Sequence, residues 1–174
     1  MGMIGGGAAG AETEAIAAAI VDAAVKLHMR LGPGLLESVY ESLLSQELRR
    51  RGLSVDRQVS VTFELDGLRF EEGFRADLIV GRCVLVELKA VEKLAPVHWR
   101  QVLTYLRLLD LRLGLLINFG GATLKQGLHR VLNDFRLSAW APSFAGDHQY
   151  LTRRHEGTKN DSGRLPDPPG ASSG

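Results

Sequence analysis

Residues 74–89 read FRADLIVGRCVLVELK, and this stretch decides the fold. Two alternating apolar runs, 74–80 and 84–90, flank Gly81, so the pattern predicts two antiparallel strands joined by a tight turn. Glu87 and Lys89 are two residues apart on the second strand. Side chains at that spacing project from the same face of a sheet, so the sequence predicts a carboxylate and an ammonium side by side.

The length of the turn decides where Asp77 points. A two-residue turn at Gly81-Arg82 pairs Asp77 with Val86 and places its carboxylate on the opposite face from Glu87. A three-residue turn that ends at Cys83 pairs Asp77 directly with Glu87, about 5 Å away. The three-residue turn also forms one apolar face, made of Ala76, Leu78 and Val80 packed against Leu88, Val86 and Val84. Because register follows the hydrophobic pattern, we expect the three-residue turn.

Two carboxylates this close repel each other, and one of them is pushed toward its protonated form. A divalent cation removes that repulsion, and carboxylate oxygens suit a hard ion such as Mg²⁺. An adjacent lysine can orient the attacking water. The alternative is a solvent-facing Glu–Lys pair on an edge strand, which is the commoner origin of an isolated E-x-K pattern. The matching position of Asp77 leaves the two interpretations balanced.

Hydrophobic periodicity along the rest of the chain predicts helices on a mixed sheet. Gly32-Pro33-Gly34 and Gly52 are expected to end the first two helices, and Asp66-Gly67 to form a hairpin turn. The second helix has Val39, Leu43, Leu44 and Leu48 as its expected inward residues. The expected elements are helices over 13–31, from 35 or 36 to 51, and over 96–110; strands over 59–65, 68–70, 74–80, 84–90 and 113–119; and a last helix or strand over 124–132. The predicted fold class is α/β, in the order α-α-β-β-β-β-α-β.

Composition points to one globular domain. The chain has 174 residues, 45% hydrophobic and 24% charged, with a formal net charge of +1, which is not the strongly basic balance of a dedicated nucleic-acid binder. Its single cysteine excludes a disulfide scaffold, and no apolar run reaches the ~20 residues needed to cross a bilayer. With no signal peptide visible, we expect a cytoplasmic protein without membrane contact. We divide it into a flexible N-terminus (1–11), one domain (12–137) and a mostly disordered tail (138–174).

Five helical residues are further candidates for the site. Gln101 and Tyr105 are four apart and share one stripe of the third helix, with His98 one turn earlier. The border of an amphipathic helix explains that stripe equally well. Glu37 opens the second helix, where a negative charge interacts favourably with the helix dipole. His28 lies near the end of the first helix, where a positive charge does so. None of these positions identifies a site by itself.

Taken together and in order, these motifs resemble the GxxExxY family of small bacterial and archaeal proteins, within the PD-(D/E)xK nuclease superfamily. The resemblance runs from about His28 to Asn133, and the name motif falls on Gly34, Glu37 and Tyr40. The other matching stretches are Phe74-Arg-Ala-Asp77, Val86-Glu87-Leu-Lys89-Ala90, Gln101-Val-Leu-Thr-Tyr105-Leu and Gly114-Leu-Leu-Ile-Asn118-Phe119. One departure is Ala76, where the superfamily name has proline.

The resemblance implies a restriction-endonuclease-like fold in which Asp77 and Glu87 ligate Mg²⁺, with Mn²⁺ as a substitute, and Lys89 serves the nucleophilic water. It implies that Glu37 reaches the same metal from its helix. Gln101 and Tyr105 would correspond to the Q-x-x-x-Y element of RecB-like nucleases. The resemblance also places three residues at supporting positions around the site, namely His28, Tyr40 and His98.

The function expected from this resemblance is metal-dependent hydrolysis of phosphodiester bonds, with DNA as the partner and the site at the edge of the sheet. Because the core is so small, a homodimer or a protein partner is also expected. The alternative is a module without catalysis on the same fold, which binds nucleic acid or another protein.

Overall fold

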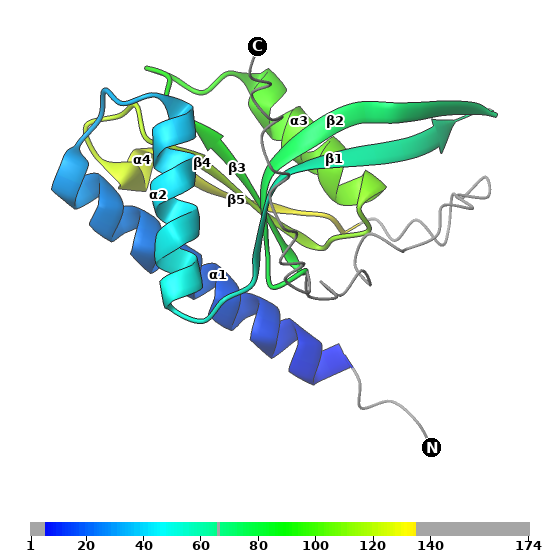
Figure 1. Cartoon of the computed structure of the whole chain (residues 1–174), viewed down its shortest axis with the longest axis horizontal. Helices are drawn as coiled ribbons and strands as arrows, with labels where there is room; N and C mark the ends of the chain where they lie inside the picture. The colour runs from blue at the N-terminus through cyan, green and yellow to red at the C-terminus, as the bar shows by residue number, and fades with distance from the viewer. Residues whose placement is uncertain (1–5, 66, 135–174) are drawn as a thin grey trace, which may run out of the picture.

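The computed structural model describes residues 6–65 and 67–134, which form an α/β domain (Figure 1). Because the apolar residues recur at helical spacing in some segments and alternate in others, helices and strands follow one another along the chain. The elements in chain order are α1 (Gly6–Leu31), α2 (Glu37–Arg50), β1 (Val55–Leu65), β2 (Leu68–Val80), β3 (Val84–Lys89), α3 (Pro96–Leu108), β4 (Leu113–Asn118), α4 (Leu124–Gly127) and β5 (Leu128–Leu132).

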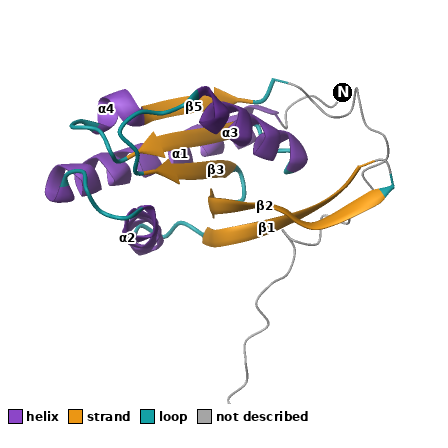
Figure 2. Ribbon diagram, turned by 90° about the horizontal axis from the view of Figure 1, so that it is seen from above, coloured by secondary structure: helices purple, strands orange, loops and turns teal. Residues whose placement is uncertain are grey.

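The strands form one five-stranded mixed sheet in the order β1-β2-β3-β4-β5. Among the strands of the described residues, only β3 and β4 pair in parallel, which α3 makes possible as the crossover between them. The β1–β2 pair is much longer than the other strands and extends beyond them as a two-stranded arm (Figure 2). The strand order makes β3 the central strand, so Glu87 and Lys89 do not lie on an edge strand.

Two apolar clusters, one on each face of the sheet, form the core. α1 and α2 cover one face, through buried residues that include Ile20, Leu44 and Leu48 against Leu78 and Val86. α3 covers the other face through Val102 and Leu106, which pack against Leu85 and Leu116. Because both faces are covered, every residue of β4 is buried, as its unbroken apolar run predicts.

The predicted register between β2 and β3 is confirmed. Val80 pairs with Val84 and Leu78 with Val86, so the turn has three residues. The Cys83 N–H donates to the Val80 carbonyl oxygen at 3.2 Å. Both Gly81 and Arg82 adopt positive φ. One detail differs, because Ala76 packs in the α3 cluster and not beside Leu78.

The first helix begins earlier than predicted. α1 starts at Gly6 and not at an N-cap on Thr13, and residues 6–11 of the expected flexible segment are helical. Three of residues 6–11 are alanine, which has the highest helix propensity, and three are glycine, which opposes it, so composition alone does not predict the early start. The Thr13 hydroxyl donates to the Ala9 carbonyl oxygen at 2.9 Å, so it bonds within the helix and does not cap it.

α2 ends as predicted, because Gly52 has φ +83° and the Leu53 N–H reaches the Leu48 carbonyl oxygen at 3.1 Å. Its start is at Glu37, one or two residues later than expected. The predicted inward residue Val39 is 37% exposed, whereas Tyr40 beside it is fully buried. Leu44 and Leu48 are fully buried and Leu43 packs against the same core, as predicted, so Val39 alone departs from the predicted stripe.

The predicted element order is wrong in one place, because residues 68–80 form a single strand and not two. The Phe63 ring lies directly over Gly73, where a side chain would collide with it, and so covers the position at which a break was expected. Leu65 pairs with Leu68, which confirms the two-residue hairpin loop, although Asp66 itself lies outside the described residues. The segment 124–132 is a short helix followed by a strand. The predicted disordered tail 138–174 lies outside the described residues.

Candidate functional site

The candidate site lies at the carboxyl end of the central strand, where β2 and β3 separate. Continuing the pairing of Leu78 with Val86 by one position places Asp77 opposite Glu87. The backbone ladder stops there, and the Asp77 side chain takes its place, because Asp77 Oδ2 accepts the Leu88 N–H at 2.8 Å. The carboxylate is thereby fixed across the strand from Glu87.

Glu87 is buried and only partly paired. Its Oε1 accepts a hydrogen bond from Lys89 Nζ at 2.7 Å, whereas Oε2 is buried with no partner among the described residues. Burial raises the pKa of Glu87 to about 7, and the neighbouring Asp77 carboxylate adds to the rise. Burial also raises the pKa of Asp77, although the Leu88 N–H opposes that rise. Burial is the main cause of both shifts, and both favour the protonated form of the carboxyl groups.

Lys89 joins the strand to the second helix. Its Nζ lies 2.7 Å from Glu87 Oε1 and 3.8 Å from Glu37 Oε1. Burial is the largest single effect and opposes the charge on Lys89, but the hydrogen bond to Glu87 and the charges of Glu87, Glu37 and Asp77 together outweigh it, so the pKa of Lys89 is raised. Lys89 therefore stays cationic between two acidic groups, as the E-x-K spacing predicts.

Glu37 is brought to the site by the loop that precedes it. Tyr40, one turn further along α2, donates its hydroxyl to the Gly32 carbonyl oxygen at 2.6 Å, and the Leu35 N–H donates to the same hydroxyl at 3.3 Å. These two bonds close the loop over 32–35, in which Gly34 has φ +112°. Burial raises the pKa of Glu37, and the nearby Lys89 opposes that rise.

Gln101 and Tyr105 face each other on α3, since Gln101 Nε2 lies 2.6 Å from the Tyr105 hydroxyl oxygen. The Tyr105 ring stacks on Phe74 of β2 with a centroid distance of 3.7 Å. Burial raises the pKa of Tyr105; Gln101 opposes the rise, and Glu87 adds to it. Phe74 lies three residues before Asp77 on β2, so the pair packs against the strand that carries this carboxylate, and its role in the site stays a prediction.

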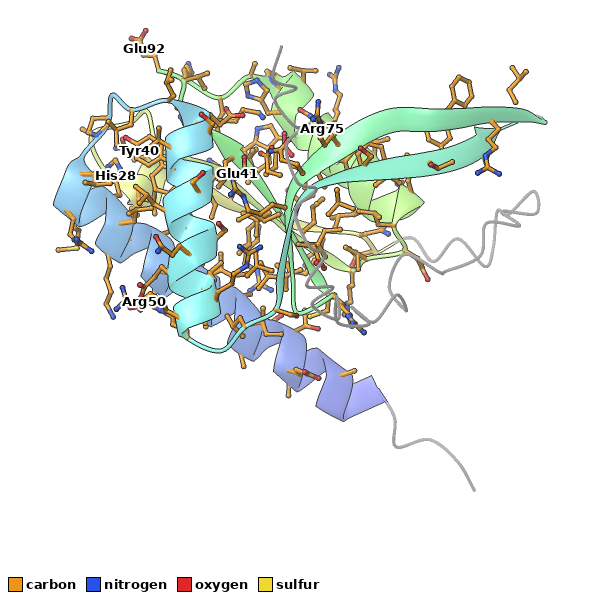
Figure 3. All side chains as sticks on the ribbon, in the orientation of Figure 1. His28, Tyr40, Glu41, Arg50, Arg75 and Glu92 are labelled. Carbon is orange, nitrogen blue, oxygen red and sulfur yellow. The ribbon has the colours of Figure 1, made fainter. Side chains whose placement is uncertain are left out.

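The two histidines have other contacts. His98 Nδ1 accepts the Ala95 N–H at 3.2 Å and so caps the start of α3. His28 Nε2 lies 3.4 Å from the Ala122 carbonyl oxygen, and its ring is 6.0 Å from that of Phe119. Tyr40 stacks on the same Phe119, and Figure 3 shows His28 and Tyr40 on the other side of α2 from Glu41. A supporting role for either histidine stays a prediction.

Two residues near the site were not predicted from the sequence, Glu41 and Gln58. Glu41 is buried on α2 and binds Arg57 Nε through Oε1 at 2.9 Å. Gln58 Nε2 lies 2.7 Å from Glu41 Oε2 and 3.4 Å from Asp77 Oδ1. The position of Glu41 four residues after Glu37 would have placed both on one helix face. No comparable signal in the sequence marks Gln58.

The donor chemistry of the site fits a hard divalent cation. Asp77, Glu87 and Glu37 offer only carboxylate oxygens, and the buried Glu87 Oε2 lacks a partner among the described residues. Within residues 6–65 and 67–134, however, no three His, Cys, Asp or Glu side chains are grouped so as to hold a metal ion. In the arrangement seen here, Lys89 supplies the positive charge beside Glu87.

Comparison with known proteins identifies the family. The family model described as the PD-(D/E)XK nuclease superfamily matches residues 14–131, more than half of the chain. The mixed sheet flanked by helices agrees with its restriction-endonuclease-like core. No curated protein and no solved structure matches the chain. The narrower resemblance to the GxxExxY family stays a prediction. Separately, none of the described helices is long and apolar enough to span a membrane.

Proposed function

This chain belongs to the PD-(D/E)XK nuclease superfamily, and from that premise we propose that it hydrolyses phosphodiester bonds in DNA with the help of a divalent cation. The observation that carries the proposal is the buried Oε2 of Glu87, opposite Asp77 and without a partner among the described residues. A buried carboxylate oxygen without a partner is costly unless a ligand uses it. A cation at this place would satisfy that oxygen and remove the repulsion between the two carboxylates.

Each site residue has a role in this proposal. Asp77 and Glu87 would hold Mg²⁺, or Mn²⁺ in its place, and Glu37 would assist from the start of α2. When bound, the cation supplies Lewis acidity and lowers the pKa of water. Lys89 orients that water and offsets the negative charge that develops on the phosphate.

Gln101 and Tyr105 would position the DNA backbone. Because Gln101 donates its amide N–H to the Tyr105 oxygen, the hydroxyl proton of Tyr105 stays free for a phosphate oxygen. No covalent protein nucleophile is needed in this proposal, since a water molecule attacks in line.

A second candidate is a nucleic-acid-binding module without catalysis. It is favoured by the lack of a ready three-ligand group among the described residues and by the engagement of Asp77 Oδ2 with the Leu88 N–H. In that case the carboxylates would be structural, and DNA affinity would survive their loss. We also propose a cytoplasmic location, which the free thiol of Cys83 supports. A homodimer or a protein partner is proposed as well.

The test is titration with Mn²⁺ by calorimetry, on the unaltered protein, on Asp77→Asn and on the control Asp56→Asn. The side-chain amide introduced by Asp77→Asn would keep an oxygen for the Leu88 N–H, so circular dichroism should show both variants folded. Asp56 is an exposed carboxylate on β1 and should not matter. We expect binding by the unaltered protein and by Asp56→Asn, and none by Asp77→Asn. Failure of all three to bind, with a DNA oligonucleotide present to complete the coordination, would refute the metal-dependent nuclease.

A further inference from the structure

Gln58 has a backbone conformation that its residue type rarely adopts. Its φ is +49°, in the left-handed region, although it lies in β1 and is not a glycine. For a long side chain this region is sterically disfavoured. Such strain persists only where the surrounding structure maintains it, and it is concentrated at functional sites.

The strained position lies directly opposite the candidate metal ligand. Arg57 pairs with Leu78 and Val59 with Ala76, so Gln58 stands across from Asp77 in the β1–β2 register. The backbone pairing between β1 and β2 skips Gln58 and Asp77, so the left-handed residue coincides with a gap in the ladder. The geometry at Gln58 therefore affects how the Asp77 side chain is presented.

The side-chain amide of Gln58 bridges two carboxylates. Its Nε2 lies 2.7 Å from Glu41 Oε2 and, in a longer contact, 3.4 Å from Asp77 Oδ1. Both neighbours are acceptors, so the amide nitrogen must face them, and its two hydrogens suffice for both. Asp77 thus has one oxygen held by the Leu88 N–H and the other by Gln58.

The far end of this bridge is fixed. Glu41 is only 4% exposed, on the helix that also carries Glu37, and its second oxygen binds Arg57 Nε at 2.9 Å. Arg57 in turn donates through Nη2 to the Ser42 hydroxyl oxygen at 2.9 Å. The bridge therefore connects a rigid point on α2 to the Asp77 carboxylate on β2.

We propose that Gln58 is a positioning residue, which orients Asp77 for cation binding and is maintained despite the backbone strain. This inference rests on the proposed function. A merely structural tie between α2 and β1 would behave differently, since its loss would lower stability and leave cation affinity unchanged. Outer partners of metal ligands typically change metal affinity about 10- to 100-fold when they are removed.

The experiment compares Gln58→Gly with Asp110→Gly. Both residues have positive φ, +49° and +52°, so glycine relieves backbone strain in each, but Asp110 follows the end of α3. We expect Asp110→Gly to melt at an unchanged temperature or about 2–4 °C higher, whereas Gln58→Gly also loses the 2.7 Å hydrogen bond to the buried Glu41 and should melt about 2–4 °C lower. Only Gln58→Gly should bind Mn²⁺ more weakly by calorimetry, by at least about tenfold.

A second variant, Gln58→Asn, separates the amide bridge from the extra freedom of glycine. Asparagine tolerates the same φ but is one methylene shorter, so it should also weaken Mn²⁺ binding without the added backbone freedom of glycine. Unchanged Mn²⁺ affinity in both Gln58 variants, with binding intact in the unaltered protein, overturns this inference alone. Absence of Mn²⁺ binding by the unaltered protein overturns the proposed function and this inference with it.

Discussion

Lys89 Nζ lies 2.7 Å from Glu87 Oε1 in a place that water hardly reaches, because the two side chains are only 14% and 3% exposed. Removal of one partner from such a pair leaves an uncompensated charge, so the two residues are energetically linked. The burial of Glu87 raises its pKa to about 7, so the carboxylate changes charge near neutral pH. Cation binding and stability should both depend on that change.

Stability without divalent cations should fall as the pH rises. The pKa of Glu87 is raised from 4.5 to about 7, so in this window the folded chain holds more protons than the unfolded chain. The stabilising contribution of the protonated form is therefore complete below about pH 4.5 and is lost as the pH passes 7. We expect a loss of roughly 2–3 kcal/mol between pH 5 and pH 8 by urea denaturation with a chelator present. Glu87→Gln should flatten this profile, and parallel profiles of both proteins would contradict the assignment.

Lys89→Met should separate cation binding from hydrolysis. Lys89 is a cation beside two carboxylates, so its loss makes the site more negative, and Mn²⁺ affinity should be equal or higher. DNA cleavage should fall by at least about 100-fold, because no group then orients the water. Lys93→Met, in the exposed loop before α3, is the matched control and should cleave normally. Cleavage that survives in folded Lys89→Met would show that Lys89 has no catalytic role.

Much of the site could be predicted because it depends on local periodicity. The alternation of Val84, Val86 and Leu88 sets the β2–β3 register, and a one-residue slip would turn that whole set from the α1–α2 face to the α3 face. The same register places Asp77 opposite Glu87. Gly52 could likewise be assigned to the end of α2, because its positive φ favours glycine.

The remaining features depend on contacts between distant segments. β2 continues through Gly73, where the Phe63 ring lies over the glycine and the β1–β2 register shifts, and no local pattern in residues 68–80 contains that information. Glu41 is buried because Arg57 of β1 and Gln58 meet it, 16 and 17 residues further along the chain. The left-handed backbone of Gln58 is the extreme case, since glutamine has no tendency toward that conformation.

Two tyrosine hydroxyls should differ in what their removal changes. Tyr40→Phe keeps the stacking on Phe119 but leaves the part-buried Gly32 carbonyl without its 2.6 Å hydrogen bond, so we expect a loss of about 1–2 kcal/mol. Tyr105→Phe keeps the stacking on Phe74, and its half-buried hydroxyl contacts Gln101, so the loss should be about 0.5 kcal/mol or less. Urea denaturation measures both losses.

Cleavage should rank the same two variants in the opposite order. Tyr105→Phe removes the hydroxyl proposed to contact phosphate, and we expect the rate at saturating Mg²⁺ to fall about tenfold or more. Tyr40→Phe, assayed well below its melting temperature, should lose less activity because its ring still supports the loop before Glu37. Equal stability losses, or full activity of Tyr105→Phe, would contradict the roles given to the two hydroxyls.

The loop that follows Lys89 should be sensitive to one methyl group at Gly120. Asn118 holds Val91 at both backbone groups, since its Oδ1 accepts the Val91 N–H at 3.0 Å and its Nδ2 donates to the Val91 carbonyl oxygen at 2.8 Å. A Cβ at Gly120 would lie 2.1 Å from that same carbonyl oxygen. The carbonyl cannot retreat without breaking the Asn118 hydrogen bond, so the added methyl group must displace the loop two residues after Lys89.

We therefore expect Gly120→Ala to cost about 2–4 kcal/mol of unfolding free energy in urea denaturation, which is an overpacking effect. Gly121→Ala is the matched control, because the nearest atom to its Cβ would be the Thr123 carbonyl oxygen at 3.5 Å, an ordinary contact. That variant should stay within about 0.5 kcal/mol of the unaltered protein. Because the displaced loop begins beside Lys89, Gly120→Ala should also cleave DNA more slowly at temperatures where it is fully folded. Similar stability of the two variants would mean that the Val91 loop yields freely and does not hold the end of β3.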